Sequence, residues 1–217
     1  MRAVLSTWDA LLRAEHDFRV GAGSLPWVRL LCTVVGGGML YGFAMGSFAG
    51  PLASLYAAIK VPLLVGGSLA VCLPNFYVVN AVLGLSDDFS AALRGILSAQ
   101  ATLAVVLVSL APVILFVHAG TDDYHAVKLW NGAIFAVASI GAQRTLARHY
   151  RPLLAKNPRH KLALIVWPAL YVFVTAQLAY ALRPYVGNPR FPTEFVRADW
   201  MGNVYLDLYW AVRGVIG

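Results

Sequence analysis

Residues 50 to 88 read GPLASLYAAIKVPLLVGGSLAVCLPNFYVVNAVLGLSDD, and this stretch decides the fold class of the chain. It is nearly all apolar and too long for one perpendicular membrane helix, since about 20 residues cross the hydrocarbon. Its interruptions are costly in lipid. A lysine in the bilayer centre costs roughly 2.5–3.5 kcal/mol on insertion scales, and an internal proline removes a backbone donor where no water can replace it.

We therefore expect this stretch to divide at Lys60. Residues 51–59 would lie at the interface, Lys60 would snorkel to the headgroups, and residues 61–83 would cross, kinked near Pro74. Pro62 would then fall in a first helical turn, where its missing donor is harmless. The alternative is a hydrated path beside the interrupting residues Lys60, Pro74, Asn75 and Asn80.

The composition of the 217-residue chain is that of a membrane protein. Hydrophobic residues make up 59% of it and charged residues 12%, about half the charged fraction of a soluble domain. The formal net charge is +7, but the basic residues lie in loops beside apolar segments and no nucleic-acid motif accompanies them. Anionic lipids, and not nucleic acid, are the expected counter-charge.

Four further apolar segments predict an all-α polytopic bundle of about five transmembrane helices. The other spans are expected at residues 27–48, 95–117, 126–143 and 162–182. The span at 126–143 has the shortest apolar centre, because Lys128, Asn131 and Gln143 interrupt it. The transmembrane domain is therefore residues 27–182. Thr33, Ser68, Asn75, Asn80, Gln100, Ser109, Asn131, Ser139, Thr175 and Gln177 would form hydrogen bonds between its helices.

Amphipathic segments flank this domain. Residues 1–26 would form a cytoplasmic interfacial helix, over residues 6–18, and a linker; the alternative is a helix packed on a soluble partner. Residues 183–217 begin with a proline-spaced extended run and continue from Asp199 as an aromatic-rich interfacial helix.

The distribution of basic residues predicts the orientation. Five spans place eleven Lys and Arg residues on the N-terminal side and six on the other, so the N-terminus is expected in the cytoplasm. Thirteen of the seventeen basic residues are arginine, a bias that indicates a bacterial chain of high GC content and thus a bacterial inner membrane.

Gly38, Gly42, Gly46 and Gly50 repeat at every fourth residue. This spacing forms a flat stripe on one helix face, where another backbone can approach closely. The stripe predicts a packing surface, either for a neighbouring helix of the same chain or for a partner subunit or second copy.

Two groups of side chains could carry chemistry. The loop from His118 to His125 offers metal-ligand types at His118, Asp122, Asp123 and His125, but its spacing fits no zinc or hard-cation template. A second acidic pair, Asp87 and Asp88, would lie across the membrane from this loop and could cap the next helix. Since hydrolase, nucleotide-binding, zincin and haem motifs are also absent, we expect no enzyme activity, cofactor or metal.

Arg144, Arg148 and Arg151 follow the 126–143 span at helical spacing, so they would project from one face. They are expected to bind anionic lipid headgroups, at roughly 1 kcal/mol per basic residue. Capture of a phosphate-bearing substrate is the alternative.

The five predicted spans, the amphipathic N-terminal segment and the sequence GPLASLYAAIKVPLL resemble those of the Yip1-type five-helix membrane proteins, of which the chain looks like a distant bacterial relative. Locally the resemblance rests on Gly50-Pro51 and Leu55-Tyr56, and over residues 27–182 it rests on topology; uncharacterised bacterial proteins have segments similar to KVPLL, LPNFYVVNAVLGL and LRPYVGNP. The resemblance implies a non-catalytic role in membrane organisation or trafficking through partner proteins. The acidic segment expected before the first span of that family is missing here.

These observations favour a non-catalytic accessory or scaffold subunit of a membrane assembly, with other membrane subunits or a second copy as partners. The alternative is a small ion channel or transporter with a path near the kinked second span.

Overall fold

The computed structural model describes residues 2–13, 26–197 and 200–206, and in this part of the chain all regular structure is helical. The α-helices are α1 (Arg2–Arg13), α2 (Trp27–Gly46), α3 (Pro51–Val82), α4 (Phe89–Gly120), α5 (Tyr124–Lys156) and α6 (His160–Ala181). Short 3₁₀ turns, η2 (Ser47–Ala49) and η3 (Ser86–Asp88), precede α3 and α4.

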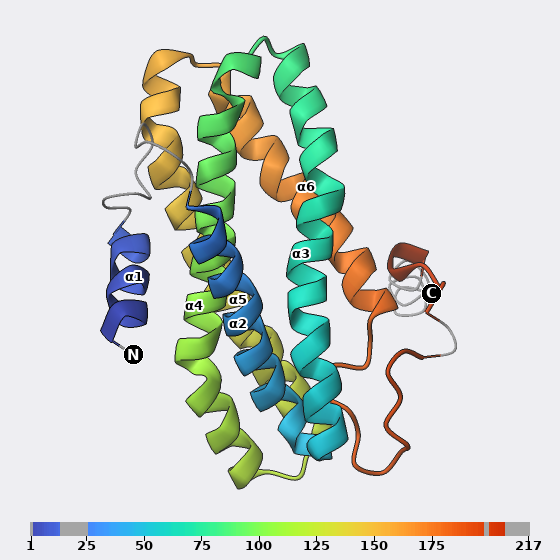
Figure 1. Ribbon diagram of the computed structural model, residues 1–217. Coiled ribbons are helices and arrows are strands. Elements are labelled where there is room, and N and C mark those ends of the chain that lie inside the picture. Colours follow the sequence, from blue (N-terminus) through green and yellow to red (C-terminus); the bar gives the residue numbers. More distant parts are fainter. Residues whose placement is uncertain (1, 14–25, 198–199, 207–217) are drawn as a thin grey trace.

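Helices α2 to α6 form an up-and-down bundle (Figure 1). Each runs antiparallel to the helix before it, so the α3–α4 and α5–α6 connections meet at one end and the α2–α3 and α4–α5 connections at the other. The described residues that follow α6, 182–197, return to this second end. The two acidic pairs of the sequence, at Asp87 and Asp122, therefore lie at opposite ends of the bundle, as expected.

Four described helical segments are long and apolar enough to cross a membrane: Trp27–Ala49, Pro51–Val82, Ser86–Gly120 and His160–Ala181. The chain is therefore an integral membrane protein by length and composition. Helix α5 covers the segment expected to be the remaining span, but it does not reach the same apolarity.

Helix α3 is continuous from Pro51 to Val82, so the expected division at Lys60 is wrong. The helix begins after Gly50, whose φ of 112° suits glycine, and Pro51 occupies the first turn in place of Pro62. Pro62 lies inside the helix, where its ring faces Gly38 of α2; a Cβ at Gly38 would lie 3.2 Å from that ring. The missing side chain of Gly38 makes room for the proline.

The N-terminal helix begins earlier than expected, at Arg2 in place of residue 6. It packs on α4, with Leu11 buried. In Figure 1 it lies beside the bundle and follows its long axis, and not across the bundle end as an interfacial helix would. The expected C-terminal interfacial helix lies largely outside the described residues, which include only 200–206 of it.

Two buried tyrosines bind amide side chains of other helices. The Tyr41 hydroxyl of α2 donates to Asn131 Oδ1 of α5 at 2.9 Å, and the Tyr171 hydroxyl of α6 donates to Gln100 Oε1 of α4 at 3.0 Å. In each pair the tyrosine hydroxyl and the amide oxygen satisfy one another in an interior where water is not expected to hydrogen-bond them. These bonds tie α5 and α6 to the rest of the bundle.

Candidate functional site

The bundle end that carries the α4–α5 connection contains a polar pocket of about 790 Å³. Its walls come from η2, from the end of α4 and the start of α5, and from residues 188–190. The charged and amide side chains that line it are His118, Asp122, Asp123, His125, Asn188 and Arg190. The structure thus brings the four metal-ligand candidates of the sequence to one pocket, together with an arginine and an asparagine.

The four candidates are not arranged as a metal centre. Among the described residues no group of three or more His, Cys, Asp or Glu side chains is placed to hold a metal ion. Asp123 is instead the N-cap of α5, where its Oδ1 accepts the backbone N–H of His125 at 2.8 Å. His118 Nδ1 lies 3.0 Å from the hydroxyl of Ser47, and its ring lies against Phe48.

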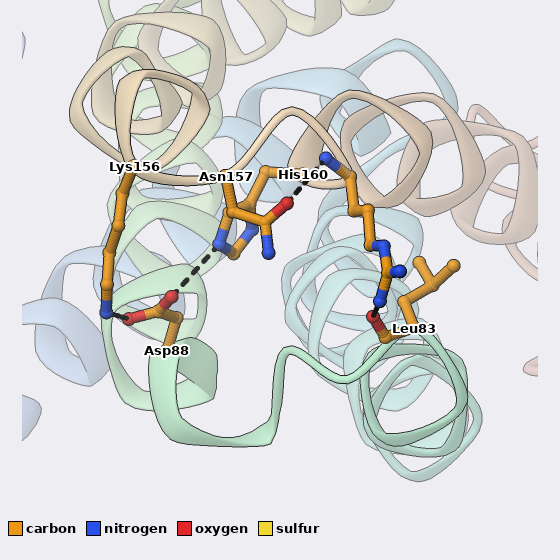
Figure 2. Close-up of polar contacts among 6 residues, drawn as sticks. Leu83, Asp88, Lys156, Asn157 and His160 are labelled. Carbon is orange, nitrogen blue, oxygen red and sulfur yellow. Dashed lines mark hydrogen bonds and ion pairs between the residues drawn. The ribbon is translucent and has the colours of Figure 1, made fainter.

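Asp88 joins the two connections at the opposite end of the bundle (Figure 2). One carboxylate oxygen lies 2.5 Å from Lys156 Nζ and the other 3.2 Å from His160 Nε2. Arg159 Nη1 adds a hydrogen bond to the backbone oxygen of Leu83 at 3.2 Å. Asp88 precedes α4 but makes no side-chain capping bond to it, so its interhelical contacts replace the cap that the sequence indicated.

Lys60 is fully buried, at 0% exposure. Its Nζ donates to the backbone oxygen of Pro184 at 2.6 Å, and the ring centroids of Phe195 and Tyr185 lie 5.1 and 6.0 Å away. Tyr185 is half-buried, and burial raises the pKa of its hydroxyl. Residues 182–197, which we call the C-terminal segment, therefore cover Lys60, which does not extend to the headgroups as a snorkelling anchor would.

The residues proposed for a hydrated path do not converge. Lys60 and Asn80 are buried and about 30 Å apart along α3, at 1.5 Å per residue. Pro74 and Asn75 lie between them in sequence but are exposed on the surface of the bundle. Asn80 Nδ2 donates to Phe76 O and Asn75 Nδ2 to Val71 O, both within α3. These four positions outline no common channel.

Three of the four stripe glycines face α3. A Cβ at Gly42 would overlap the backbone oxygen of Ala57, one at Gly46 would lie 2.6 Å from the Cα of Ser54, and Gly38 faces Pro62. The fourth, Gly50, is the turn before α3 and has open space around it. The stripe is therefore occupied by a helix of the same chain and offers no free surface to a partner.

Arg144, Arg148 and Arg151 are exposed on the C-terminal half of α5. Arg148 Nη1 donates to the backbone oxygen of Leu12 in α1 at 3.3 Å. The three side chains therefore lie on the exposed surface of this half of α5, and Arg148 also contacts α1.

Sequence reasoning assigned no role to Pro184, Asn188 or Arg190. All three lie in LRPYVGNPRF, whose proline spacing predicts only an extended run. The feature that could have indicated a structural role for this run is its cluster of Pro and Gly residues in a short polar stretch. Such a cluster is typical of an ordered turn that packs on other elements. Gly187 within it has a φ of 68°, and a Cβ there would lie 2.8 Å from Ala49.

Comparison of the chain with protein-family models, with curated proteins and with solved structures finds no match.

Proposed function

We propose that this protein is a non-catalytic membrane subunit that associates laterally with a helix of another membrane protein or of a second copy, as an accessory or scaffold component. The observation that carries the proposal is the position of Asn75. This amide lies on the exposed face of α3, inside a segment apolar enough to span the membrane.

Asn75 belongs to a stripe on α3 that we call the outer face, formed by Val71, Asn75, Val78 and Val82. The valines are 53%, 58% and 81% exposed, respectively. Asn75 Nδ2 donates to Val71 O at 2.8 Å, and the amide oxygen is available to a donor outside the chain. In hydrocarbon such a polar group is favoured where another helix satisfies it. An apolar stripe with one central amide thus suits a partner helix.

The bundle arrangement supports a crossing by α5, and therefore five spans. Residues 129–143 separate Lys128 from Arg144 and measure about 22 Å at 1.5 Å per residue, less than the hydrocarbon thickness of about 30 Å. Both flanking cations have long stems that can reach the headgroups, and local thinning accommodates the remaining mismatch. With five spans, the arginine-rich half of α5 and the α5–α6 connection would lie on the cytoplasmic side with the N-terminus. Arg144, Arg148 and Arg151 would there bind anionic headgroups.

A channel or transporter role receives less support. Lys60 is sealed by the C-terminal segment, and the kink residues face outward. The relationship to Yip1-type proteins stays a prediction from the sequence.

The experiment compares Val78→Trp and Asn75→Leu on the outer face with Ile165→Trp on α6, an apolar position that is also 58% exposed. Protein purified in mild detergent is examined by size-exclusion chromatography with light scattering, and its co-purifying membrane proteins are identified. We expect an assembly larger than the monomer that the outer-face variants lose and Ile165→Trp keeps. A wild-type protein that is only monomeric and carries no stoichiometric partner would overturn the proposal.

A further inference from the structure

A lateral groove runs between α5 and α6. It has a volume of about 460 Å³, its floor includes Gln100 and Leu103 of α4, and Tyr185 and Val186 of the C-terminal segment close one end. Along α5 it extends from Lys128 to Gln143, a distance of about 22 Å at 1.5 Å per residue. The groove is therefore long, narrow and roughly aligned with the bundle axis.

Small residues keep the groove open. Gly132 of α5 and Ala176 and Ala179 of α6 line it, and a Cβ added at Gly132 would meet nothing within 4 Å. The amides at its base are already engaged, since Asn131 accepts from Tyr41 and Gln100 accepts from Tyr171. What remains exposed in the groove is largely apolar.

The length and volume of the groove decide which kind of ligand fits it. A helix is about 10–12 Å in diameter, too wide to lie within a groove whose volume of about 460 Å³ is spread over this length. A single extended hydrocarbon chain has the required long, narrow shape. Lipid chains in a bilayer also run along the bundle axis, as the groove does. Since the groove opens toward lipid, a chain can enter from the side.

One end of the groove carries a charge. Lys128 is the charged residue among the described groove residues, and its Nζ lies 5.7 Å from the ring centroid of Tyr124. Trp130, which is 50% exposed, lies half a turn along the helix. Tyrosine and tryptophan gather at the headgroup level of membrane proteins. Lys128 is thus placed to meet a headgroup, and its charge favours an anionic one.

We propose that the α5–α6 groove binds an anionic phospholipid, with one acyl chain between the helices and the phosphate at Lys128. The lipid site is separate from the outer face of α3 and does not depend on the partner proposed for that face.

The test is retention of lipid by the purified protein. Wild type and variants are reconstituted in nanodiscs that contain equal phosphatidylglycerol and phosphatidylcholine, transferred to mild detergent, and examined by native mass spectrometry. Gly132→Phe fills the groove and is expected to lower the retained phospholipid about tenfold relative to wild type. Gly66→Phe is the matched control, because Gly66 is a helical glycine with equally open surroundings outside the groove.

Lys128→Gln tests the headgroup. It is expected to abolish the preference for phosphatidylglycerol over phosphatidylcholine while a lipid is still retained, whereas Lys161→Gln, at the opposite end of the bundle, is expected to keep that preference. If Gly132→Phe fails to fold, Ala179→Leu fills the groove from the α6 side.

The proposal is overturned by equal lipid retention in wild type and a folded groove variant, or by equal loss in Gly66→Phe. Loss of a co-purifying membrane protein with lipid retention unchanged would assign the groove to a partner and would also overturn it.

Discussion

Lys60 Nζ donates a 2.6 Å hydrogen bond to the backbone oxygen of Pro184, which lies 124 residues further along the chain. The bond joins the third turn of α3 to the C-terminal segment and leaves the lysine without exposed surface. A cation in an apolar bundle needs such an acceptor, because an unpaired charge there is expensive. The C-terminal segment is therefore part of the folded bundle end, and not a loose tail.

Replacing Lys60 tests this connection. Lys60→Met keeps the volume of the side chain but removes the donor, and the lost charge-assisted bond is worth about 1.5–3 kcal/mol. We expect the bundle to fold and residues 182–197 to be cleaved faster in limited proteolysis. Lys161→Met, at an exposed position, is expected to leave the cleavage rate unchanged. An unaltered rate in Lys60→Met would show that the other contacts of the segment are enough to hold it.

Asp88 and its neighbour Asp87 provide a test position and a control position at the bundle end that carries the α3–α4 connection. Asp88→Asn removes the negative charge between Lys156 and His160, while Asp87 is exposed. Because Lys156 is largely solvated and His160 is buried, we expect a loss of about 1–2 kcal/mol. Thermal unfolding in mild detergent should show a lower melting temperature than wild type for Asp88→Asn. The melting temperature of Asp87→Asn should equal that of wild type. Equal melting temperatures for the two variants would contradict a stabilising role for Asp88.

Gly42 is where close helix packing is most sharply tested. Since a Cβ at Gly42 would overlap the Ala57 backbone, Gly42→Leu must push α2 and α3 apart, at a cost above the 1–3 kcal/mol typical of overpacking. We expect poor expression and early thermal unfolding. Gly36→Leu provides the comparison on the same helix, because Gly36 has open space around it, and it is expected to fold as the wild type does. Normal stability of Gly42→Leu would show that the two helices can separate without loss.

The sequence predicted where the helices lie better than where their polar side chains point. Thr33, Ser109 and Ser139 were expected to bond other helices, yet each hydroxyl donates to the carbonyl four residues earlier in its own helix. Such a bond is always available to Ser and Thr in a helix, so only packing decides whether another partner competes. The two tyrosines that do bridge helices, Tyr41 and Tyr171, were not singled out, because an aromatic residue in an apolar run does not reveal which face it occupies.

The residues proposed for a path do not come together in the bundle, for a related reason. Lys60, Asn75 and Asn80 are neighbours in a polar-interrupted sequence, but on a helix they occupy different faces and depths. The pocket with His118 and Arg190 shows the opposite effect: residues 72 positions apart share one wall because the C-terminal segment returns to the α4–α5 end. Spacing along one helix can be read from sequence, whereas the meeting of separate segments cannot.

The sequence by itself determined that this is a membrane protein of long helices, because apolar length and the cost of unpaired backbone groups in lipid leave little choice of structure. It also indicated the stripe of Gly38, Gly42 and Gly46, since a four-residue period defines a helix face. Tertiary structure decided what that face packs against, that α3 continues through Lys60 and Pro62, and that Lys60 is covered by Pro184. These outcomes depend on which segments meet in space: Gly38 leaves room for the proline ring, and a distant carbonyl satisfies the lysine.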